Sequence, residues 1–218
     1  MIKNDNNNNN YKFNFKDIAQ SSANALKKGE ILSVLFAGVG GQGIILATTV
    51  LSNAAINAGY DVKVSEVHGM AQRGGSVEGS VRIGKQVFSP TISNADFIVA
   101  LEKLEAIRYA QKLSDGGFML VNNYSIYPST VFSKDMSYPE NTEDLLSEFT
   151  ENFYFINAVD KAKNIGNIRV SNTIMTGALS LFLPFEQDCW LDAIKKSVPE
   201  KALQINIEAF ESGRNFLK

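Results

Sequence analysis

Cysteine and histidine are scarce in this chain, and their scarcity excludes several kinds of site. The chain has 218 residues but only one cysteine, Cys189, and one histidine, His68. A single cysteine cannot form an internal disulfide, and it cannot supply the four thiolates that an iron–sulfur cluster usually requires. Any such cluster must therefore belong to another chain.

Excess positive charge and long apolar runs are also missing. Lys and Arg number 21 against 23 Asp and Glu, a net charge of −2, so no broad basic surface is available to neutralise a nucleic-acid backbone. No apolar run approaches the ~18 residues of a membrane span, and the amino terminus lacks the basic and apolar regions of a signal peptide. We therefore expect a soluble, cytoplasmic protein that binds neither nucleic acid nor membrane.

Composition divides the chain into a tail and one domain. Residues 1–12 include a run of asparagines and contain too few apolar groups to offset the entropy of ordering them, which predicts a disordered tail. Residues 13–218 are enough for one α/β domain with a sizeable core.

Within that domain, strand-like and helix-like patterns follow one another. The apolar run 31–37 predicts a buried strand, residues 43–58 a helix ended by Gly59, and residues 61–67 a second strand. The other expected elements are a lead-in helix at 15–30, a hairpin of 76–84 with 86–90, strands at 96–102, 117–123 and 152–158, and helices at 103–113, 171–183, 188–198 and 200–217. We expect an α/β fold: a parallel or mixed sheet flanked by helices, with a Rossmann-like start and a helical carboxy-terminal region.

The first glycine-rich segment, "GVGGQG", follows the first strand and opens the first helix of the expected sheet. Its residues of interest are Gly38, Gly40, Gly41, Gln42 and Gly43. Glycines permit positive φ and a close approach of the backbone, and a helix amino terminus favours an anion. The pattern is compatible with a dinucleotide whose ribose is bound by Glu66, with another anion, or with a tight turn alone.

The second glycine-rich segment, "HGMAQRGGS", is the other candidate site. Its polar residues and glycines are His68, Gln72, Arg73, Gly74, Gly75 and Ser76. Arg73 can hold a carboxylate or phosphate bidentately while backbone amides converge on the same anion, or the segment is only a polar loop at a sheet edge. No partner for His68 as a catalytic base can be identified, and Cys189 is expected to be a buried apolar residue.

The helical segment "NTIMTGALSLFLPF" carries more apolar surface than one helix stripe requires. It is buried either in this chain's own core or partly against another subunit. Asn172 and Gly177 are candidates for such an interface, since asparagine caps helices or bonds across a contact and glycine allows helices to approach closely.

Five segments taken together resemble one known family. "AGVGGQGI", "EVHGMAQRGGSV", "SPTI", "RVSNTIMTGAL" and "INIEAFESG" are similar to the gamma-type domain of 2-oxoacid:ferredoxin oxidoreductases, from about Ser33 to Phe216. The "HGMAQRGGS" segment is typical of the family members that act on indolepyruvate, whereas relatives acting on pyruvate or 2-oxoglutarate carry a different version.

The resemblance implies a subunit of an enzyme that oxidatively decarboxylates arylpyruvates. It implies a partner alpha subunit that binds thiamine diphosphate, Mg²⁺ and the iron–sulfur clusters, with coenzyme A and ferredoxin as co-substrates and no metal in this chain. The "GVGGQG" segment is then a glycine turn with no nicotinamide requirement, Glu66 contacts no ribose, and the second segment faces the partner's active site. The isolated chain is expected to be inactive. The alternatives are another gamma subunit of the family, a stand-alone nucleotide-binding domain or dehydrogenase, and a non-catalytic assembly protein.

Overall fold

The central strand of the fold is β1 (Leu32–Val39). The structure is a computed structural model that describes residues 14–68, 75–127, 138–139 and 141–216. Its sequence, LSVLFAGV, is buried at every residue but the last. Such a continuous apolar run is typical of a strand covered on both faces. The expected disordered tail, residues 1–12, lies outside the described residues.

The sheet is mixed, with six strands in the order β2-β3-β1-β4-β5-β6. Strands β4, β5 and β6 run parallel to β1, whereas β3 is antiparallel to both β1 and β2. The strands besides β1 are β2 (Asp61–His68), β3 (Ser76–Gly84), β4 (Ala95–Ala100), β5 (Leu113–Asn122) and β6 (Phe153–Ile156). The expectation of an α/β sheet flanked by helices is confirmed.

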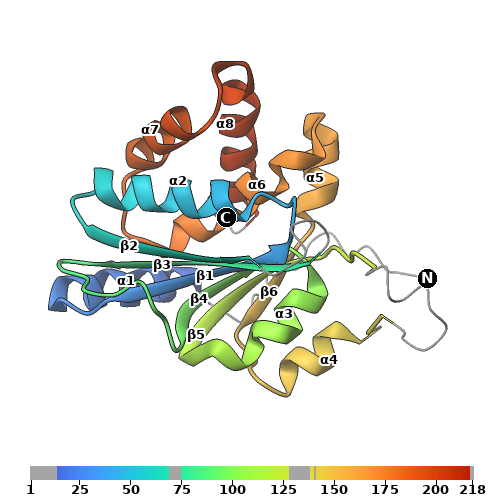
Figure 1. Ribbon diagram of the computed structural model, residues 1–218, viewed down its shortest axis with the longest axis horizontal. Helices are drawn as coiled ribbons and strands as arrows, with labels where there is room; N and C mark the ends of the chain where they lie inside the picture. Colours follow the sequence, from blue (N-terminus) through green and yellow to red (C-terminus); the bar gives the residue numbers. More distant parts are fainter. Residues whose placement is uncertain (1–13, 69–74, 128–137, 140, 217–218) are drawn as a thin grey trace.

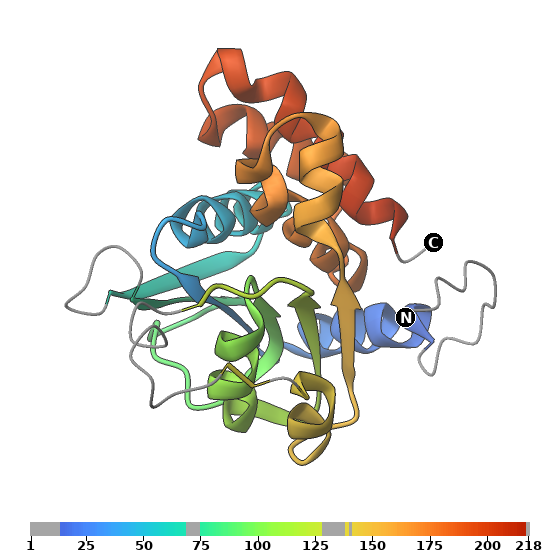
Figure 2. The same cartoon turned by 90° about the vertical axis from the view of Figure 1, so that its right-hand side faces the viewer.

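Helices cover both faces of this sheet, as Figures 1 and 2 show. On one face lie α2 (Ile44–Asn57), α5 (Ala158–Ile165), α6 (Ser171–Leu179), α7 (Gln187–Ser197) and α8 (Glu200–Asn215), and on the other lie α3 (Lys103–Tyr109) and α4 (Thr142–Ser147). Helix α1 (Phe15–Lys28) packs by Phe15 against Phe182 and Phe118 at the margin of the first face. Short 3-10 turns occupy Ala110–Lys112, Ile168–Val170 and Ser180–Phe182. No helix in the described ranges is long and apolar enough to cross a membrane.

The sheet has a hydrophobic core on each face, because the side chains of a strand point alternately to the two faces. In β5, Phe118 and Leu120 pack with α2 and the carboxy-terminal helices, whereas Met119 and Val121 pack with α3 and α4. Successive strand residues point to opposite faces, so a strand buried on both faces must be apolar throughout. This explains why β1, β4 and β5 could be predicted from apolar runs in the sequence.

The expected hairpin between 76–84 and 86–90 is wrong. Strand β3 pairs instead with β2 and β1, and residues 86–90 form no strand. Pro90 has no N–H to donate to a ladder, and side chains hold this segment: the Val87 amide donates to Asp61 Oδ2 at 2.7 Å, and Arg82 Nη1 donates to the Ser89 carbonyl at 2.9 Å.

Candidate functional site

The carboxyl ends of β1, β4, β5 and β6 meet at one edge of the sheet, which faces the reader in Figure 2. Strand β2 ends and β3 begins at the same edge, where His68 pairs with Val77 and Val39 pairs with Ser76. Both glycine-rich segments therefore border this carboxyl edge. Open α/β sheets bind their ligands at this kind of edge.

Gln42 holds the first glycine-rich segment in place. Its side-chain oxygen accepts a hydrogen bond from the Val39 amide at 2.7 Å, and its side-chain nitrogen donates to the Leu101 carbonyl at 2.9 Å. The turn after β1 is thereby tied to the end of β4. Sequence reasoning placed Gln42 in the turn but did not foresee this clamp, because Leu101 lies on a different strand–helix connection.

The glycines of this turn are required by backbone conformation and by crowding. Gly41 and Gly43 have φ of 103° and 82°, a region that other residues rarely adopt. A Cβ on Gly43 would lie 2.3 Å from Asn172 Nδ2, and one on Gly38 would lie 2.8 Å from the side-chain oxygen of Gln42. The turn itself therefore explains the glycines at positions 38, 41 and 43.

A hollow of about 260 Å³ opens beside this turn. Its lining consists of Val39, Gly40, Gly41, Gly43, Ile44, Ile45 and Val77. The Ile45 side chain is half exposed, at 51%. Among the described residues this lining has no charged side chain, so these residues offer a phosphate only backbone amides.

The second glycine-rich segment is described at its two ends. His68 ends β2 and Ser76 begins β3, whereas Gln72, Arg73 and Gly74 lie outside the described residues. The Gly75 carbonyl accepts a hydrogen bond from the Gly40 amide at 2.9 Å. The two segments, predicted separately from the sequence, are therefore in direct contact.

Two carboxylates at the same edge were missed by sequence reasoning. Glu102, the N-cap residue of α3, is 1% exposed, and Glu105, in the first turn of this helix, is 3% exposed. The Ser76 hydroxyl donates to Glu105 Oε2 at 2.5 Å, and the Tyr138 hydroxyl donates to Glu102. Burial raises the pKa of Glu105, an effect that the Ser76 hydrogen bond and the Arg108 guanidinium oppose. The sequence did contain one indication of this pair: Glu102 closely follows an apolar strand, a position from which a side chain can cap the next helix.

Asn172 and Gly177, predicted as interface candidates, lie inside this chain's own fold. The Asn172 side chain is 2% exposed and donates to the Gly43 carbonyl at 3.0 Å. Gly177 packs against α8: a Cβ added at this position would lie 2.1 Å from the Phe210 carbonyl oxygen. Among the alternatives for this helix, the structure fits burial in the chain's own core.

The sheet order argues against a dinucleotide bound as in a Rossmann domain. In that arrangement the second strand lies next to the first, so that its terminal acid reaches the ribose. Here β3 lies between β1 and β2. Glu66 of β2 instead accepts a hydrogen bond from Thr48 of α2 at 3.0 Å.

Glu66→Ala is accordingly expected to leave the chain folded, because it removes one partly exposed hydrogen bond worth about 1 kcal/mol. The activity of the complex that the sequence resemblance implies is expected to stay within about twofold. Calorimetry of the wild-type chain with NAD should show no binding. Micromolar NAD binding that the substitution abolishes would restore the dehydrogenase alternative.

Comparison with known proteins identifies the family of this chain. The chain belongs to the pyruvate ferredoxin/flavodoxin oxidoreductase family, whose model matches residues 33–216. It is 38% identical over 188 residues to the indolepyruvate oxidoreductase subunit IorB of Thermococcus kodakarensis, covering 83% of this chain and 93% of that protein.

Two solved structures share the fold. The gamma subunit of a keto/oxoacid ferredoxin oxidoreductase from Geobacter sulfurreducens superposes with a TM-score of 0.65 at 24% identity, covering 85% of this chain and 95% of that one. The 2-oxoglutarate:ferredoxin oxidoreductase of Magnetococcus marinus, determined with 2-oxoglutarate, coenzyme A and succinyl-CoA, superposes with a TM-score of 0.67 at 20% identity, covering 86% of this chain but 31% of that one. In the second protein the same fold is therefore one part of a longer chain.

Proposed function

We propose that this chain is a subunit of an indolepyruvate:ferredoxin oxidoreductase. The reaction converts indolepyruvate, coenzyme A and oxidised ferredoxin into indoleacetyl-CoA, CO₂ and reduced ferredoxin, and related arylpyruvates are substrates of the same kind. The observation that carries this proposal is the 38% identity with an indolepyruvate oxidoreductase subunit across 83% of this chain and 93% of that protein. The "HGMAQRGGS" segment supports the same substrate class.

The cofactors belong to a partner alpha subunit in this proposal. That subunit would hold thiamine diphosphate with Mg²⁺ and the iron–sulfur clusters, and thiamine diphosphate supplies the chemistry of decarboxylation. An iron–sulfur cluster usually requires four thiolate ligands, and this chain has one thiol. That thiol belongs to Cys189, which is partly buried on α7. Within the described ranges, no three His, Cys, Asp or Glu side chains are grouped to hold a metal ion.

The chain's own contribution is to shape the shared active site from its carboxyl edge. His68, Gln72, Arg73 and Ser76 come from the segment that would face the partner, and Arg73 would bind the carboxylate of the 2-oxoacid or a phosphate of coenzyme A. The glycine-rich turn and Gln42 support that segment through the hydrogen bond between Gly40 and Gly75. We place the complex in the cytoplasm, where its ferredoxin would be found.

The test is to produce the chain with and without an alpha subunit of the same family from the same organism. The complex is expected to reduce ferredoxin or a viologen with indolepyruvate and phenylpyruvate, and at least tenfold more slowly with 2-oxoglutarate. The chain alone is expected to be colourless, iron-free and inert. Stoichiometric iron in the chain purified alone under anaerobic conditions would contradict the assignment of cofactors, and preference for 2-oxoglutarate would contradict the assignment of substrate.

A further inference from the structure

Two carboxylates are buried where α3 begins, and burial is costly for a carboxylate unless several donors compensate it. The donors to Glu102 and Glu105 come largely from outside α3. They are contributed by the first residue of β3 and by the chain that follows β5. Besides capping α3, the two glutamates therefore connect this helix to β3 and to the chain after β5.

Glu105 joins α3 to β3. Its Oε2 accepts the hydrogen bond from the Ser76 hydroxyl at 2.5 Å, and Arg108 Nε lies 3.4 Å from its Oε1. The Arg108 side chain is 54% exposed, whereas that of Glu105 is 4% exposed, so water weakens the ion pair more than it weakens the hydrogen bond. Hydrogen bonds to a carboxylate are among the stronger ones in proteins. Of these two contacts of Glu105, the hydrogen bond from Ser76 is thus better protected from water than the ion pair with Arg108.

Ser76 connects this carboxylate to the glycine-rich turn. The residue before it, Gly75, accepts the hydrogen bond from the Gly40 amide, and Tyr109 of α3 places its hydroxyl 3.3 Å from that of Ser76. The start of β3 is consequently held by α3 on one side and by the turn on the other. In the sequence, this is the point at which the second glycine-rich segment ends.

Glu102 extends the same link to the chain beyond β5. Its Oε1 accepts hydrogen bonds from the Ile126 amide at 3.0 Å and from the Tyr138 hydroxyl, and its Oε2 accepts from the Glu105 amide at 3.0 Å. Burial, together with the hydrogen bond to Glu102, raises the pKa of Tyr138. Its hydroxyl therefore keeps the proton that it donates.

We propose that Glu105 is a positioning residue: through Ser76 it holds the start of β3 against α3, and thereby sets the affinity of the assembled enzyme for its 2-oxoacid. The inference rests on the proposed function, because that function places the carboxyl edge at the partner's active site. Glu105 touches no substrate in this account. Its effect passes through the backbone of Gly75 and Ser76.

Four variants of the assembled complex test this inference. Ser76→Ala, Glu105→Gln and the double variant are each expected to raise the KM for indolepyruvate about tenfold with kcat within about twofold. The double variant is expected to match the single ones, because Ser76→Ala removes the donor of this hydrogen bond and Glu105→Gln removes the acceptor charge that strengthens it. Ser76→Thr keeps the hydroxyl and is expected to recover most of the affinity. Glu208→Gln, an exposed carboxylate on α8, serves as the matched control.

Hydrogen exchange of the full chain alone supplies an independent measurement. Amides of residues 75–79 are expected to exchange about tenfold faster in Ser76→Ala and Glu105→Gln than in wild type or the control. Unchanged exchange, a normal KM in an active complex, or effects that multiply in the double variant would each overturn the inference. If exchange changes but the wild-type complex oxidises no 2-oxoacid, the proposed function fails and the link to substrate affinity fails with it.

Discussion

Arg73→Ala is expected to lower kcat/KM of the assembled enzyme about ten- to a hundredfold, the effect of losing a charge-assisted contact of about 1.5 to 3 kcal/mol. Arg73 lies outside the described residues, so the expectation rests on its sequence setting before Gly74 and Gly75 and on the family of the chain. The structure adds that both ends of its segment, His68 and Ser76, border the carboxyl edge.

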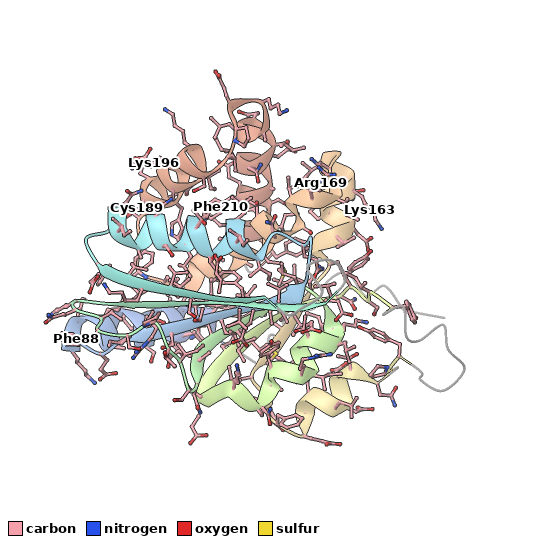
Figure 3. All side chains as sticks on the ribbon, viewed as in Figure 1. Phe88, Lys163, Arg169, Cys189, Lys196 and Phe210 are labelled. Atoms are coloured by element: carbon pink, nitrogen blue, oxygen red, sulfur yellow. The ribbon has the colours of Figure 1, made fainter. Side chains whose placement is uncertain are left out.

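The substitution Arg73→Lys separates charge from geometry. Lysine keeps the charge but cannot reproduce a bidentate fork, so this variant is expected to lose part of the activity. A rise in KM for coenzyme A would identify a phosphate as the anion, and a rise in KM for the arylpyruvate would identify the carboxylate. Lys196→Ala, which removes an exposed charge on α7 (Figure 3), is the control. Normal kinetics in both Arg73 variants would show that the segment only closes the sheet edge.

Gly213→Ala is expected to destabilise the chain by about 3 kcal/mol or more, at the upper end of what overpacking a core costs. A Cβ at position 213 would lie 1.9 Å from the Ile174 carbonyl oxygen, and one at Gly177 would lie 2.1 Å from the Phe210 carbonyl oxygen. The obstacles are backbone atoms of α6 and α8, so rotation of a side chain cannot relieve the clash. The two helices must separate instead.

Thermal or urea unfolding of the purified chain measures this effect. For a chain of this size the loss corresponds to a fall in Tm of roughly 6 to 12 °C. Glu211→Ala, at an exposed position of α8, is expected to change stability by less than about 0.5 kcal/mol. A Tm for Gly213→Ala within about 2 °C of wild type would show that α6 and α8 do not pack as closely as the structure has them.

Local patterns predicted the elements that are long and regular. The buried run of β1 and the helix that follows the glycine-rich turn were both located to within a few residues. Helices α4 and α5 were not predicted, since they span six and eight residues and too few turns for a period to emerge. Helix α5 begins where the expected strand 152–158 ends.

The sequence by itself determined that the turn after β1 needs glycine, that no cluster can be built from one cysteine, and which family the motifs indicate. These are properties of residue types and of short spacings. Only the tertiary structure decided that β3 lies between β1 and β2, that Gln42 clamps Leu101, and that Glu105 holds Ser76. Each of these joins residues from separate elements, and such pairings depend on the packing of the whole sheet, which no local pattern in one sequence records.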